Sequence, residues 1–309
     1  MTSAVDRLPD LLERLVPSRT ARAFSFAILA GIFFQALNAV ARHLTQELPP
    51  LEVSWGRWIT GWLFIAPFLL RGGFAPVRTS QMPRHLLRGV FHTAGYGLWY
   101  WAIVGIPLAQ AAALGFTGPI FVTLGAALFL GERVRWQRWL AVLLGFAGVL
   151  LIVQPWTAAL NSYALLMLAC VPLTASSNLV AKVISAHEKP EVIVFWQSTL
   201  AVVFFAPLGL WDFRMPTLEQ FGWLAVAGIT GTMGYFLMTW AFRIADISSV
   251  QTVGFLGIVW ATLFDLAVFG QTADLWTFIG AGVIVAATSY IAHRESVATR
   301  TGAGRAGAV

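Results

Sequence analysis

Two ionisable side chains stand inside long apolar stretches of this sequence, where an uncompensated charge is unfavourable. Arg57 lies in the apolar stretch 51–70, and Asp265 lies in 247–269. A charge at the centre of a bilayer costs roughly 2.5–3.5 kcal/mol on insertion scales, so each side chain should face a cavity or a partner. Arg57 could bind a substrate carboxylate or phosphate, meet a helix end, or pair with Glu52. Asp265 could bind a proton or a cationic group, pair with Arg57, or reach the outer interface.

Two further apolar stretches each carry a polar stripe. Residues three or four positions apart share one face of a helix. The stripes consist of Gln35, Asn38 and Arg42 in 23–44, and of Thr174, Asn178 and Lys182 in 163–184. They could form a polar, partly basic cavity wall with one cation at each mouth. Alternatively, the cations extend to the interface from helix ends, and Asn38 and Asn178 only join helices by hydrogen bonds.

Aromatic side chains form stripes in the stretches 85–104 and 221–242. Tyr96 and Tyr235 lie in the middle of these stretches, where a pair of rings would suit a planar or amphipathic ligand. His92 could titrate near neutral pH, and packing is the alternative role for all of these rings. The candidate substrate-binding residues are Gln35, Asn38, Arg57, His92, Tyr96, Tyr100, Asn178, Gln197, Tyr235 and Trp240. The candidate gating or coupling residues are Arg42, Lys182, Asp265 and Pro119.

The composition is that of a membrane protein. Apolar residues make up 58% and charged residues only 11%, against about a quarter charged in soluble domains. The basic residues are spread between apolar stretches rather than gathered into a patch, which argues against nucleic-acid binding. Cys170 is the single cysteine, so neither a disulfide framework nor a thiolate metal cluster is expected, and we predict no cofactor.

Ten apolar spans fit the sequence. A helix needs about 20 apolar residues to cross a bilayer. The expected spans are 23–44, 51–70, 85–104, 108–130, 136–153, 163–184, 192–210, 221–242, 247–269 and 275–293. The sequence therefore predicts an all-α integral membrane protein with ten transmembrane helices.

The basic residues predict the orientation of these spans. Most of the 20 Lys and Arg residues fall in the first tail, in alternate connectors and in the last tail, so both termini should be cytoplasmic. No cleavable signal peptide is recognised, and we expect a multi-pass protein of the cell inner membrane. Residues 1–22 should form a cytoplasmic segment with an amphipathic helix carrying Leu8, Leu11, Leu12 and Leu15, or else a flexible tail. Residues 295–309 should form a flexible cytoplasmic tail.

The chain is internally duplicated. The stretch 89–131 matches 228–270 at a constant offset of 139 residues, and further pairs match at an offset of 140. The pairs include Gly89/Gly228, Gly95/Gly234, Tyr96/Tyr235, Trp101/Trp240, Asn38/Asn178 and Pro50/Pro190. Spans one to five thus correspond to spans six to ten, in repeats 23–154 and 155–294. Because five is odd, the second copy should be inverted, as in secondary transporters whose substrate site lies near the midplane between repeats.

This plan resembles the drug/metabolite transporter superfamily, in its ten-helix EamA-type branch. The resemblance covers nearly all of residues 21–295 and depends on the duplicated unit and on the segments that close each copy, 119–132 and 260–271. The family's Gly-Glu pair is present at Gly131-Glu132, whereas the second copy has Gly270-Gln271 and lacks that charge. Pro119, replaced by Ile258 in the second copy, is expected to kink the fourth span beside the cavity.

The resemblance implies a secondary transporter that moves a small polar or amphipathic metabolite by alternating access, with export favoured. An amino acid, a nucleotide-like metabolite, a vitamin or a drug would fit. The expected partners are this substrate and the lipid bilayer, with a proton as candidate coupling ion, in a monomer or a homodimer. A channel or structural membrane protein is the alternative. A membrane-embedded enzyme is disfavoured because the spans contain no H-E-x-x-H, G-x-S-x-G or clustered Asp/His/Cys pattern.

Overall fold

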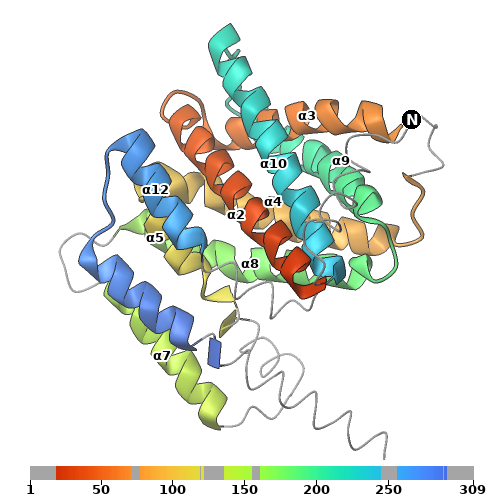
Figure 1. The fold of residues 1–309 in the computed structure, drawn as a ribbon. Coiled ribbons are helices and arrows are strands. Elements are labelled where there is room, and N and C mark those ends of the chain that lie inside the picture. Colours follow the sequence, from red (N-terminus) through yellow and green to blue (C-terminus); the bar gives the residue numbers. More distant parts are fainter. Residues whose placement is uncertain are drawn as a thin grey trace, which may run out of the picture.

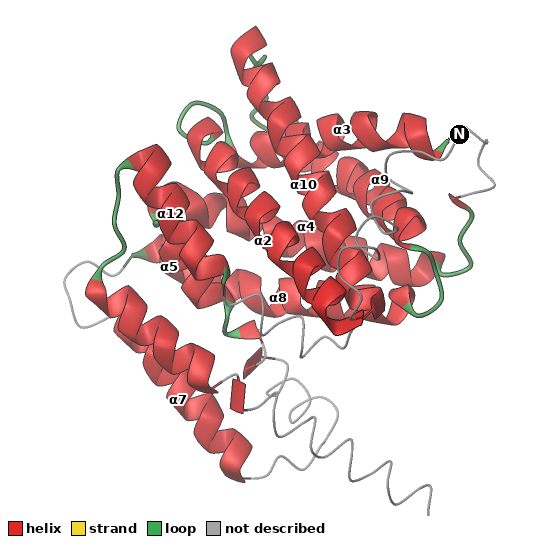
Figure 2. Cartoon of the chain, viewed as in Figure 1, coloured by secondary structure: helices red, strands yellow, loops and turns green. Residues whose placement is uncertain are grey.

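The chain is helical wherever the computed structural model describes it. The described residues are 19–70, 77–118, 120–121, 136–154, 161–244, 256–287 and 289–290, and they contain no strand (Figure 2). The helices are α2 (Arg19–Leu44), α3 (Pro50–Leu69), α4 (Met82–Gly105), α5 (Leu108–Gly115), α7 (Trp136–Val153), α8 (Ser162–Ser185), α9 (Pro190–Gly209), α10 (Leu218–Ile244), α12 (Gly257–Phe269) and the helix Leu275–Ala287. The predicted all-α class is confirmed for these residues.

Several helices have the length and the composition of membrane spans. Among the described residues, four are long and apolar enough to cross a bilayer: Ala21–Leu44, Ser162–Ser185, Pro190–Gly209 and Leu218–Ile244. Proline stands in the first turn of α3, α4 and α9, where its missing N–H has no helical partner to lose. The local sequence thus accounts for where these three helices begin.

The predicted fourth span is shorter than expected. The structure ends α5 at Gly115, followed by a turn at Phe116 and Thr117, whereas the sequence predicted one span over 108–130. Pro119 and most of the remainder of that span lie outside the described residues, as do residues 245–255 at the start of the predicted ninth span. The predicted leucine-bearing segment near the N-terminus and the tail 295–309 also lie outside them.

The helices pack in pairs drawn from the two halves of the chain. In Figure 1, α2 (red-orange) runs beside α10 (cyan), and α4 packs along α8 in the same manner. Helices α3 and α9 pack on each other, and each also contacts one member of these pairs, α10 and α4 respectively. Helix α7 lies beside the helix Leu275–Ala287 at one side of the molecule (Figure 1).

Glycine allows two of these crossings to be close. A Cβ atom on Gly61 of α3 would lie 2.9 Å from the carbonyl oxygen of Gly228 in α10. A Cβ atom on Gly148 of α7 would lie 2.8 Å from the carbonyl oxygen of Gly280 in the last described helix. Real Cβ atoms do not approach backbone this closely, so these backbones are in direct contact.

Two ends of the helical bundle are used below. The Leu44 end is where α2, α4, α9 and α12 finish and where α3, α5 and α10 begin. The Ser185 end is where α8 and α10 finish and where α4 and α9 begin.

Candidate substrate site

Aromatic rings of α3, α4 and α10 form a buried group between the two ends. The His92 ring stacks on Tyr96 at 4.3 Å between centroids and meets Trp58 edge-on at 5.2 Å. Tyr235 contacts His92 at 5.5 Å and Tyr96 at 6.3 Å. Tyr100 lies one helical turn beyond Tyr96 and is also buried. These five rings, together with Arg57, Arg88 and Gln197, are called the central cluster below.

Arg57 contributes a charge to the central cluster. Its side chain is 1% exposed, and its guanidinium carbon lies 3.8 Å from the centroid of the Trp58 ring. The same carbon lies 5.7 Å from the Tyr100 ring and 6.0 Å from the Tyr235 ring. Gly231 of α10 makes room for the guanidinium, because a Cβ atom there would lie 2.9 Å from Nη1. Three rings therefore surround a cation by favourable contacts with its charge.

Arg88 brings a second buried cation, from α4. It is 4% exposed, and it exerts an electrostatic influence on Tyr96, Tyr235 and His92, as Arg57 also does. Its position follows from helix periodicity, since Arg88, His92, Tyr96 and Tyr100 are spaced by four residues on one buried face of α4.

Several polar atoms of the central cluster have no hydrogen-bond partner within the described protein. Both amide atoms of Gln197 are buried and unpaired, as are Nε and Nη2 of Arg57 and Nε and Nη1 of Arg88. His92 Nε2 and the Tyr100 hydroxyl are unpaired as well. Buried polar groups are normally satisfied, so a concentration of unsatisfied donors and acceptors marks a place suited to a polar ligand.

The predicted stripe on α2 is only partly committed to this site. Asn38 donates to the Gln35 side chain at 3.2 Å and accepts from the Trp99 indole at 3.2 Å. These bonds join α2 to α4, which is the structural role considered as the alternative for Asn38.

Arg42 and Asp265 form an ion pair at the Leu44 end. Arg42 Nη1 lies 3.0 Å from Asp265 Oδ1, and Nη2 donates to Gln271 at 2.9 Å. The Asp265 carboxylate also accepts from the backbone N–H groups of Leu108 and Ala109, in the first turn of α5. Two expected contacts are therefore wrong. Asp265 pairs with Arg42 and not with Arg57, and Arg42 is 7% exposed rather than extended to the interface.

Glu52 is likewise not the partner of Arg57. Its carboxylate accepts from the backbone N–H of Arg214 at 2.9 Å, in the connection before α10. Glu52 is in the first turn of α3, so this contact is at the Leu44 end and leaves Arg57 without an acidic partner among the described residues.

The Ser185 end is closed by different groups. Lys182 donates to the carbonyl oxygen of Phe242 at 2.8 Å, which ties the end of α8 to the end of α10. Glu188 lies in the turn after α8, where His85 Nε2 is 2.8 Å from its Oε2 and the Thr79 hydroxyl donates to its Oε1. His85 is 1% exposed, so this contact between α4 and the α8–α9 connection is buried.

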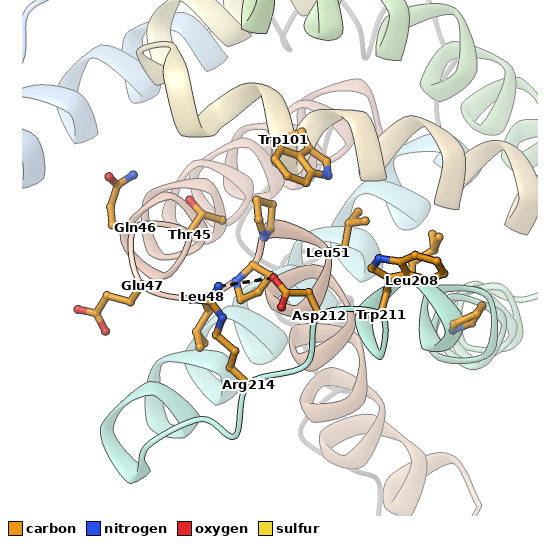
Figure 3. A pocket seen from close by; sticks show the side chains of 14 residues that line it. Thr45, Gln46, Glu47, Leu48, Leu51, Trp101, Leu208, Trp211, Asp212 and Arg214 are labelled. Carbon is orange, nitrogen blue, oxygen red and sulfur yellow. Dashed lines mark ion pairs between the residues drawn. The ribbon is translucent and has the colours of Figure 1, made fainter.

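The Leu44 end holds a pocket of about 400 Å³. Figure 3 shows Trp101 of α4 on one side of it and the Asp212–Arg214 ion pair, 3.5 Å long, on the other. Glu47 and Leu48 line it from the turn between α2 and α3. The pocket thus gives the Leu44 end a polar, partly aromatic recess.

The structure brings together six of the predicted substrate-binding residues. These are Arg57, His92, Tyr96, Tyr100, Gln197 and Tyr235. Trp240 packs beside them, next to Tyr235 and Phe236. Asn178 does not join them, because it is exposed on α8, while its neighbour Ser177 is buried against the backbone of Arg88. Pro119 lies outside the described residues.

Sequence reasoning missed two members of the site. Arg88 was placed in a basic connector, although its spacing of four from His92 already indicated the buried face of α4. Trp58 was overlooked because it directly follows Arg57 in an aromatic-rich stretch. At an offset of 140 residues, Arg57 and Trp58 correspond to Gln197 and Ser198, all of them buried, and this repeat signal could have found both pairs.

A buried polar and aromatic cluster between apolar helices of membrane-spanning length is the arrangement expected of a membrane transporter. The sequence profile described as the EamA-like transporter family matches twice, over residues 21–154 and 161–292, so the chain belongs to the EamA-like transporter family. It is a membrane transporter of the drug/metabolite superfamily, and members of the family are transporters rather than enzymes. The predicted resemblance is confirmed.

Three relatives are similar along nearly their whole length. The riboflavin transporter of Rhizobium johnstonii is 35% identical, with 90% of this chain and 93% of that protein covered. The pseudopaline exporter CntI of Pseudomonas aeruginosa is 30% identical, with 84% and 92% covered. The S-adenosylmethionine uptake transporter of Rickettsia bellii is 25% identical, with 88% and 93% covered. A crystal structure at 20% identity shares the fold, with a TM-score of 0.59 over 89% of this chain and 98% of its own.

Proposed function

We propose that this chain is a secondary transporter that moves a small metabolite with a planar ring across the inner membrane by alternating access. The observation that carries the proposal is the central cluster, in which stacked rings adjoin polar atoms that lack partners. Rings would hold a flat ligand by stacking, and the unpaired groups would bind its polar edge.

The packing of the halves supports two inverted repeats. Gly95 of α4 lies against Thr174 of α8, and Gly234 of α10 lies against Phe34 of α2. Gly95 and Gly234 correspond at an offset of 139 residues, and Phe34 and Thr174 correspond at 140. The two contacts are thus one contact made twice with the halves exchanged, as a pseudo-twofold relation requires.

The two bundle ends support alternating access. The Ser185 end is joined by the buried contact of Glu188 with His85 and Thr79. The corresponding connection at the Leu44 end makes an exposed contact, from Gln220 to Glu47 at 2.7 Å, beside the pocket. Equivalent connections thus meet in a buried contact at one end and an exposed one at the other, and exchange of the two arrangements would open the site to the opposite side.

The relatives supply the first ligand to test. The most similar of those described above is a riboflavin transporter, and riboflavin has a planar tricyclic ring with a polar chain. The aromatic cluster suits such a ring better than an aliphatic amino acid. Riboflavin is therefore our first candidate substrate. The named relatives include both an uptake transporter and an exporter, so we retain export from the family resemblance and propose a proton as the coupling ion.

The test is transport by the purified full-length protein in sealed lipid vesicles. Labelled riboflavin should enter at a saturable rate, and unlabelled riboflavin on the opposite side should accelerate it. Strictly linear flux would point to a channel instead. Imposed pH gradients of both signs measure coupling and direction in the same vesicles. Gln197→Ala should weaken transport affinity, whereas Asn178→Ala, on the exposed surface of α8, should leave it unchanged. Cysteine labelling of each terminus in cells tests the predicted cytoplasmic orientation.

A further inference from the structure

The central cluster contains two buried arginines and no acid to neutralise them. Among the described residues, neither Arg57 nor Arg88 forms an ion pair. The acids nearest in the fold are committed elsewhere: Asp265 to Arg42, Glu52 to the Arg214 backbone, and Glu188 to His85 and Thr79.

Two cations of like charge beside one another are unfavourable in a site that excludes water. Both guanidinium groups influence His92 and both tyrosines of the cluster, so their charges act on the same small region. The contacts of Arg57 with Trp58, Tyr100 and Tyr235 offset part of its charge. No comparable ring contact of Arg88 is recorded in the described structure. An anion bound between the two arginines would offset both charges.

The unpaired atoms match the geometry of an oxyanion. Arg57 leaves Nε and Nη2 unbonded, and Arg88 leaves Nε and Nη1 unbonded. A guanidinium presents its N–H groups in a planar fork that binds two oxygens of a carboxylate or phosphate. Four such donors, contributed by α3 and α4 beside stacked rings, form a site for an acidic group attached to a planar ring.

We propose that the substrate of this transporter is a planar aromatic anion, whose ring stacks in the central cluster and whose carboxylate or phosphate binds Arg57 and Arg88 together. This inference rests on the proposed transport function and narrows its substrate class. Its rival is a neutral ring whose carbonyl oxygens accept from the arginines. A neutral ring would satisfy the donors but would leave both positive charges uncompensated, so the anion is favoured.

Three flavins that share one ring separate these ligands. They are riboflavin, its 5′-phosphate ester, and the same ring with a carboxymethyl group on N10. Binding to the purified full-length protein is measured from quenching of flavin fluorescence. At least one anionic flavin should bind about 10-fold or more tightly than riboflavin. The stronger of the two anions identifies the acidic group as phosphate or carboxylate.

Variants connect this preference to the arginines. Arg57→Gln and Arg88→Gln should each weaken binding of the preferred anion about 10- to 100-fold, and should change riboflavin binding less than about threefold. Arg57→Lys and Arg88→Lys keep the charge and should retain the preference for the anion. Arg84→Gln is the matched control, since Arg84 is exposed one turn earlier on α4.

Two results would overturn the proposal. One is riboflavin binding as tightly as both anionic flavins. The other is an equal loss of affinity for all three ligands in the Gln variants. Saturable riboflavin transport without any anion preference would overturn this inference and leave the transport function standing. Absence of saturable flux and of flavin binding would overturn both.

Discussion

The Arg42 guanidinium donates to the Asp265 carboxylate at 3.0 Å, although 223 positions separate the two residues. The same carboxylate accepts from two backbone N–H groups in the first turn of α5, so one buried acid joins α2, α5 and α12. The corresponding position in the first repeat is Ala126, and Lys182, the counterpart of Arg42, binds a backbone carbonyl instead. The two bundle ends are therefore held by different chemistry, and this difference can set which end opens more easily.

Breaking the Arg42–Asp265 pair should destabilise the fold. Asp265→Asn leaves a buried guanidinium without its counter-charge, which typically costs about 3–5 kcal/mol. Unfolding in detergent micelles measures the loss. Asp212→Asn is the control, because its pair with Arg214 is more than 60% exposed on both sides and should change stability by less than about 1 kcal/mol. Equal losses in the two variants would contradict the buried role.

Gly228→Ala should loosen the crossing of α3 and α10. The added Cβ atom would lie 2.8 Å from the carbonyl oxygen of Arg57 and closer still to Gly61, so the backbones must separate. Such overpacking costs about 1–3 kcal/mol, measured by the same unfolding experiment. Gly222→Ala on the same helix meets nothing within 4 Å and should instead gain up to about 1 kcal/mol from helix propensity. Stabilisation by both variants would show that the crossing is not tight.

Tyr96→Leu should weaken binding of a planar ligand about 2- to 10-fold, because the ring stacked on His92 is removed. Flavin fluorescence titration measures the affinity. Tyr290→Leu replaces an exposed tyrosine and should have no effect on it. If Tyr96→Leu lowered only the yield of folded protein and left the affinity unchanged, the ring would be a packing residue.

Glu188→Gln should make the Ser185 end open more readily. The substitution weakens the contact with His85 and removes a charged acceptor from Thr79, and both groups hold the α8–α9 connection to α4. A cysteine at buried Thr93, in a Cys170→Ala background, should then react severalfold faster with a polar maleimide added on the Ser185 side. His187→Gln is the control, since His187 is exposed and bonds only within its own turn. An unchanged labelling rate would show that Glu188 does not limit opening.

The sequence by itself determined the helical class, the apolar stretches and the burial of Arg57, because composition and a period of 3.6 residues are local properties. It also paired Tyr96 with Tyr235 before any fold was known, through the repeat. What only the tertiary structure decided is which residue each helix turns inward and which partner each charge takes. Consecutive helical residues point about 100° apart, so a small rotation of α8 buries Ser177 and exposes Asn178. Packing sets that rotation, and it also brings Asp265 to Arg42 and leaves Arg57 and Arg88 without an acid.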